Sequence, residues 1–95
     1  MKVHWTQNAI RQLVILHEYI ALNSTTYALR MVNNITARSQ QIADHPLSGR
    51  QVPEYDAEDT RELIEKPYRI IYRIKPDQID VLAVIHGSRR LPDYF

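Results

Sequence analysis

Hydrophobic residues in the first half of the chain recur every three or four positions. The first stripe follows Thr6, whose hydroxyl can accept a hydrogen bond from a free amide of a first helical turn. Its members are Ile10, Leu13, Val14, His17 and Ile20. The second stripe follows the polar run 23–26 and comprises Ala28, Met31, Val32, Ile35 and Ile42. This spacing predicts two helices, which the short polar turn would fold into an antiparallel hairpin.

After residue 60 the period of the hydrophobic positions changes from 3.6 to two. Pro46 and Gly49 end the helical pattern, and the acidic segment that follows is expected to form an exposed loop. Three strands are predicted, at 61–65, 68–74 and 79–86, with short connections typical of antiparallel hairpins. Residues 1–5 form an expected additional strand. The order of elements indicates one α+β domain over residues 1–95, with the N-terminal helical hairpin packed on one face of a small antiparallel β-sheet.

The alternation also predicts a register for the last hairpin, because one register places its apolar side chains on the helix-facing side. That register pairs Ile74 with Ile79, Tyr72 with Val81, Ile70 with Ala83 and Tyr68 with Ile85. An ion pair between Arg73 and Asp80 is then expected on the other face. That face is predicted to be a mixed surface that carries Thr60, Glu62, Arg69, Arg73, Asp80 and His86.

Length and composition restrict the classes of protein to consider. A chain of 95 residues, 44% hydrophobic and 24% charged, makes a small domain with a thin core, which argues against a large cofactor enzyme. The absence of cysteine excludes disulfides, thiolate zinc sites and cysteine nucleophiles. The four histidines lack the spacing of a metal site, so we expect neither a metal nor a cofactor. No apolar run reaches the ~18 residues of a membrane span, so a cytoplasmic protein is expected.

The net charge of +1 conceals an uneven distribution, with −4 over residues 46–65 and +3 over residues 66–95. The basic third ends with Arg89 and Arg90, whose guanidinium groups can hold a phosphate or a carboxylate. His86 can exchange protons near neutral pH, and the aromatic residues at 94–95 can stack on a base. A solvated surface accounts for these residues as well, and the charge count alone favours it.

Several segments, taken in order, resemble the RelE/ParE superfamily of type II toxins. They are the Trp5-Thr6 step before the first helix, the Tyr19-Ile20-Ala21 run, and segments 46–54, 61–63, 67–74 and 84–90. Each is short, but together they span nearly the whole chain. RelE-like members of this superfamily cleave mRNA on the ribosome, whereas ParE-like members inhibit DNA gyrase.

The resemblance also implies candidate residues for both activities. Under the RelE-like alternative, an mRNA endoribonuclease, the catalytic residues would be Arg69, His86, Arg89 and Tyr94. The lysines that this mechanism needs on the preceding strand are replaced by Thr60 and Glu62, and an acid is unsuited to stabilising a scissile phosphate. This departure favours the ParE-like branch.

The favoured hypothesis is therefore a ParE-like toxin that inhibits DNA gyrase, arrests growth and is neutralised by a cognate antitoxin in a toxin–antitoxin hetero-oligomer. Contacts with the target or the antitoxin are expected near Arg69, Arg73, Arg89 and Arg90. The first alternative is the RelE-like endoribonuclease, whose partners would be the ribosome and mRNA. The second is an interaction module without toxicity.

Overall fold

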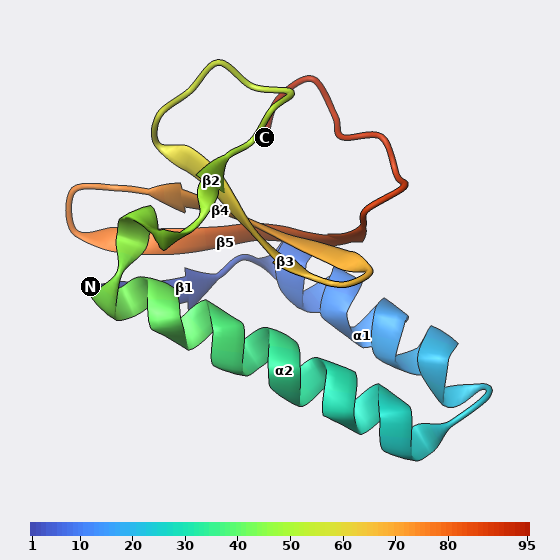
Figure 1. Ribbon diagram of the computed structural model, residues 1–95. Helices are drawn as coiled ribbons and strands as arrows, with labels where there is room; N and C mark the ends of the chain where they lie inside the picture. Colours follow the sequence, from blue (N-terminus) through green and yellow to red (C-terminus); the bar gives the residue numbers. More distant parts are fainter.

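The computed structural model describes residues 1–95, and its elements follow in the predicted order. They are β1 (Lys2–Trp5), α1 (Gln7–Ala21), α2 (Thr25–Asp44), a 3₁₀ turn (Pro46–Ser48), β2 (Arg50–Gln51), β3 (Thr60–Glu65), β4 (Tyr68–Ile74) and β5 (Gln78–His86). Figure 1 shows α1 and α2 side by side as an antiparallel hairpin beneath one face of the sheet. The predicted α+β architecture is confirmed.

The sheet has five strands in the order β1-β5-β4-β3-β2 and is mixed rather than wholly antiparallel. β1, the expected additional strand, runs parallel to β5, whereas the other neighbouring pairs are antiparallel. Thr6 fixes the end of β1, because its amide and its hydroxyl both donate to the carbonyl of Val81, at 3.1 and 2.9 Å. The two-residue strand β2, which the alternation did not predict, forms the opposite edge.

Both helices begin at the side-chain caps that their sequences offer. The Thr6 hydroxyl accepts from the Ala9 amide at 3.2 Å, and the Ser24 hydroxyl accepts from the Tyr27 amide at 3.1 Å. These bonds satisfy amides that have no partner within the first helical turn. Neither helix has the combined length and apolarity needed to cross a membrane.

The buried face of α2 is the predicted one, but that of α1 is partly different. In α2 the buried apolar residues are Ala28, Met31, Ile35 and Ile42. In α1 the buried residues are Ala9, Leu16 and Ile20. Ile10 and Val14 of the predicted stripe are instead about half exposed. α1 carries apolar residues around much of its circumference, so spacing alone does not identify its buried face.

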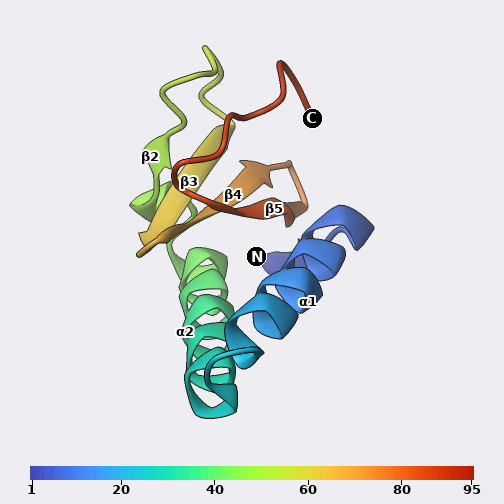
Figure 2. The ribbon, with the colours of Figure 1, turned by 90° about the vertical axis from the view of Figure 1, so that its right-hand side faces the viewer.

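The sheet carries hydrophobic clusters on both faces, which corrects the expectation of a mixed, exposed outer face. The helix-facing cluster takes from the sheet Leu63, Tyr68, Ile70, Tyr72, Ile79, Val81 and Val84. The outer cluster comprises Val52, Ile71, Leu82, Ala83, Ile85 and Leu91, with Tyr55 and Phe95 packed against it. Figure 2 shows the segment after β2 and the C-terminal tail lying over this outer face. The acidic segment is therefore anchored to the sheet through Val52 and is not simply an exposed loop.

The predicted register of β4 against β5 is correct at one end and wrong at the other. Tyr72 pairs with Val81 as expected, but an irregularity between Ile71 and Tyr72 shifts the remaining pairs by one residue. Ile70 consequently lies opposite Val84, and Tyr68 lies opposite His86. The run 81–85 is apolar throughout and both sheet faces are buried, so alternation does not fix the register there.

The expected ion pair between Arg73 and Asp80 is absent, although these residues are register partners. The Asp80 carboxylate instead accepts from the Lys75 ammonium and from the Gln78 amide, at 2.6 and 2.7 Å. These two neighbours bind one oxygen each, and His4 Nδ1 lies 3.4 Å from the carboxylate. Asp80 is thus satisfied by residues at the turn between the strands and leaves Arg73 unpaired.

Candidate functional site

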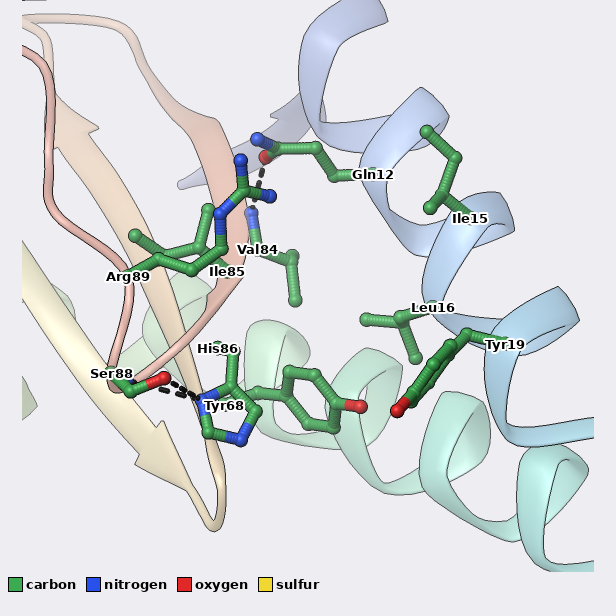
Figure 3. Close-up of a pocket in the computed structure, with 10 residues that line it drawn as sticks. All are labelled: Gln12, Ile15, Leu16, Tyr19, Tyr68, Val84, Ile85, His86, Ser88 and Arg89. Carbon is green, nitrogen blue, oxygen red and sulfur yellow. Dashed lines mark hydrogen bonds between the residues drawn. The ribbon is translucent and has the colours of Figure 1, made fainter.

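A surface groove of about 450 Å³ lies between α1 and the end of β5. We call it the α1–β5 groove. Its lining residues are Gln12, Ile15, Leu16, Tyr19, Tyr68, Val84, Ile85, His86, Ser88 and Arg89. Figure 3 shows these side chains converging from α1, β4, β5 and the turn after β5. The groove therefore brings together residues from both ends of the chain.

The middle of the α1–β5 groove is apolar and open to solvent. Ile15 is 56% exposed and Tyr19 is 70% exposed, although both are large hydrophobic residues. The ring of Tyr68 meets the His86 imidazole edge to face, with 5.7 Å between ring centroids. Burial raises the pKa of the Tyr68 hydroxyl, and the nearby Tyr27 hydroxyl raises it further. An open apolar groove of this kind is typical of a surface that binds another macromolecule.

The end of the groove next to β5 is polar and positively charged. The side-chain oxygen of Gln12 accepts from the Val84 amide at 2.9 Å. The Ser88 hydroxyl lies 2.8 Å from His86 Nδ1, and the Ser88 amide donates to the same nitrogen at 3.1 Å. Figure 3 shows the Arg89 guanidinium next to the Gln12 amide. Arg89 belongs to none of the ion pairs of the structure, so its charge is available to a partner.

Arg69 lies outside the groove, in a network of charges on the outer face of which Arg69 and Glu62 form the buried part. Its Nε donates to a Glu62 carboxylate oxygen at 2.6 Å, and its two terminal nitrogens donate to Glu54 at 2.8 and 2.9 Å. The Glu62 side chain is fully buried and also accepts a bond from Arg50 Nε at 2.6 Å. Hydrogen bonding to Glu54 raises the pKa of Arg69, and the same contact lowers the pKa of Glu54. Each nitrogen of the Arg69 guanidinium thus donates to a carboxylate of Glu54 or Glu62.

The structure brings only some of the remaining predicted site residues together. His86 and Arg89 share the α1–β5 groove, and Arg90 joins Arg89 at a neighbouring pocket. Arg73 lies half-buried on β4, and Tyr94 is 83% exposed in the tail. No three His, Asp or Glu side chains lie together in a way that would hold a metal ion.

The apolar residues of the groove were not among the predicted site residues. Ile15 and Tyr19 lie four positions apart on α1 and outside the stripe that was expected to be buried. A second apolar row on a helix that already has a buried face indicates a contact surface. That row was the available signal in the sequence, and Tyr68 was assigned only to the core.

Comparisons with known proteins give a consistent result. Residues 3–91 match the family model described as ParE toxin of type II toxin-antitoxin system, parDE. A Sinorhizobium fredii protein named "Putative toxin Y4kP" is 33% identical over 93 residues, which cover 96% of this chain and 93% of that protein. A solved structure titled "Chromosomal ParDE TA system from P. aeruginosa" has the same fold, with a TM-score of 0.75, 24% identity and coverage of 90% of this chain and 95% of that one. The chain therefore belongs to the ParE toxin family of type II toxin–antitoxin systems.

Proposed function

We propose that this toxin inhibits DNA gyrase by binding it, without cleaving any bond itself, and that a cognate antitoxin neutralises it. Membership of the ParE family supports the class of toxin. The pairing of Arg69 with two glutamates is the observation that favours gyrase inhibition over RNA cleavage. This arginine would have to clamp a phosphate in a ribonuclease, but Glu54 and Glu62 occupy it here.

Cleavage of RNA by its own 2′-hydroxyl needs a base, an acid and groups that stabilise the phosphate. Of the residues expected to supply them, only His86 and Arg89 lie together. Thr60 and Glu62 stand where the mechanism needs lysines, and Glu62 is buried as an acceptor of arginine bonds. The geometry therefore supports action through binding better than action through phosphodiester chemistry.

The α1–β5 groove has the chemistry to hold part of the antitoxin. Its apolar middle fits the apolar face of an amphipathic segment, with side chains placed beside Ile15 and Tyr19. Its basic end at Arg89 fits a carboxylate of the same segment. A segment bound in this way would cover one face of the toxin and keep it from its target.

Expression of the chain without its antitoxin tests the function in cells. We expect growth to stop, DNA replication to fall before protein synthesis does, and messages to stay intact in primer extension. Discrete ribosome-dependent cuts in mRNA, lost in His86→Ala and in Arg89→Ala, would establish the endoribonuclease alternative. Unimpaired growth under strong expression would show an interaction module without toxicity.

A further inference from the structure

A second pocket, of about 330 Å³, adjoins the α1–β5 groove and shares Gln12, Ile85 and Arg89 with it. We call it the arginine pocket. Its lining residues are Asn8, Gln12, Ala83, Ile85, Arg89, Arg90, Pro92 and Phe95. It joins the start of α1 to the turn and the tail that follow β5, and no acidic side chain lines it.

The two arginines of this pocket are free to bind an anion. Neither guanidinium has a carboxylate within 4.0 Å, in contrast to Arg50 and Arg69, which glutamates neutralise. The oxygen of the Gln12 side chain is already bonded to the Val84 amide, so its amino group is the part left to donate. The polar lining therefore offers hydrogen-bond donors in excess of acceptors.

Phe95, in the tail, is one of the residues that line the pocket. Phe95 packs edge-on against Tyr55, with 6.0 Å between ring centroids. The Tyr55 hydroxyl donates to the carbonyl of Pro92, which fastens the tail to the outer face. Leu91 is buried in the outer cluster directly after the two arginines. The turn that carries the arginines is thus held between β5 and an anchored tail, which reduces the entropy lost when they bind.

We propose that the arginine pocket binds phosphates of the DNA backbone. The inference rests on the proposed function, because DNA held by gyrase would be within reach of the bound toxin. A backbone phosphodiester has two free oxygens, as a carboxylate has, so one arginine fork satisfies one such group. Two adjacent forks and an amide therefore offer enough donors for two successive phosphates of a DNA strand. The chain carries a net charge of only +1, so attraction to DNA must come from a local cluster of this kind.

NMR titration of the isolated toxin with a 12-base-pair DNA duplex tests the proposal without gyrase. We expect the side-chain N–H signals of Arg89, Arg90 and Gln12 to shift together with the backbone amide of Phe95. Neutralisation of about two phosphates predicts an affinity that falls roughly tenfold between 50 and 200 mM salt. The double variant Arg89→Gln, Arg90→Gln should bind at least about tenfold more weakly while its spectrum stays folded.

The control variant Lys2→Gln, Arg30→Gln removes the same charge from exposed residues outside the pocket and should bind DNA as the parent does. Equal loss of binding in both double variants would overturn the proposal, since it would indicate diffuse attraction. Tighter binding of a poly-glutamate peptide than of DNA would also overturn it and assign the pocket to an acidic protein segment. DNA binding by the isolated toxin and inhibition of gyrase are measured in separate assays, so failure of this proposal can be distinguished from failure of the proposed function.

Discussion

Arg69 and Glu62 are diagonal neighbours on β4 and β3, and 2.6 Å separates the Arg69 Nε from the Glu62 carboxylate. The Glu62 side chain is fully buried, and the arginines that face it compensate its charge. Removing one partner of a buried pair leaves an uncompensated charge. Arg69 therefore stabilises the fold by pairing with Glu62, and for the same reason it is not free to bind a phosphate.

Arg69→Ala should lower the free energy of unfolding by about 3 kcal/mol, because Arg50 alone would remain to face Glu62. Urea denaturation followed by circular dichroism measures this change. Arg73→Ala is the matched control, since Arg73 lies on the same strand and forms no ion pair. It should cost less than about 0.5 kcal/mol. Equal losses of unfolding free energy in the two variants would show that the ion pairs of Arg69 contribute nothing measurable to stability.

Gly49→Ala should destabilise the fold by about 1–3 kcal/mol through overpacking. A Cβ at this position would lie 2.5 Å from the Tyr72 hydroxyl oxygen and 2.6 Å from the Glu62 carbonyl oxygen. The Gly49 amide also donates to that hydroxyl at 3.0 Å, so Gly49 and the Tyr72 hydroxyl cannot move apart without losing this bond. Gly87→Ala serves as the comparison, because the Cβ added there would lie 3.2 Å from its nearest neighbour, the Pro67 carbonyl oxygen. Thermal melts in which Gly87→Ala is the less stable variant would contradict this explanation.

Acid should weaken the fold through Asp80 and Glu54. The hydrogen bond from Lys75 lowers the pKa of Asp80, and the bond from Arg69 lowers the pKa of Glu54. Both pKa values lie below the ordinary 3.8 and 4.5, so this stabilisation is complete above those values. It is lost as the pH falls through the lowered pKa values of the folded state.

Asp80→Asn isolates one part of this pH dependence. The variant should be about 1–2 kcal/mol less stable at pH 7, because the charged hydrogen bonds are lost. Its free energy of unfolding should then change less than that of the parent between pH 7 and pH 3. Urea unfolding at both pH values gives the comparison. A parallel pH dependence in parent and variant would exclude Asp80 as a source of acid sensitivity.

Tyr19→Glu should weaken the complex with the cognate antitoxin at least tenfold while leaving the toxin folded. Tyr19 lines the α1–β5 groove and is 70% exposed, so a charge there disrupts binding and not the core. Leu29→Glu is a suitable control, since Leu29 is 57% exposed on α2 and does not line the groove. Calorimetric titration of both variants measures the effect. Unchanged affinity of Tyr19→Glu would place the antitoxin on another surface.

Periodicity predicted the helical hairpin and the three main strands, because each has a marked apolar side. It did not predict which face of α1 is buried, since Ile15 and Tyr19 form a second apolar row on that helix. Nor did it predict the bulge near Ile71 or the outer hydrophobic cluster. The outer cluster depends on Val52 and Leu91, which lie in irregular segments where spacing carries no information.

The candidate site was harder to predict than the fold. Sequence pattern brought His86 and Arg89 to the end of one strand, and the structure places both in the same groove. The occupation of Arg69 by Glu54 depends on how the segment after β2 folds back over the sheet. Glu54 and Arg69 are 15 residues apart, and no local rule connects them.

A gyrase supercoiling assay with purified components tests directly whether this toxin inhibits gyrase. The toxin is added in increasing amounts to gyrase and relaxed plasmid, with and without an equimolar amount of the cognate antitoxin. We expect supercoiling to stop near stoichiometric toxin, with gyrase held on the DNA, and we expect the antitoxin to restore it. Full supercoiling activity at a stoichiometric excess of folded toxin would contradict the proposed function.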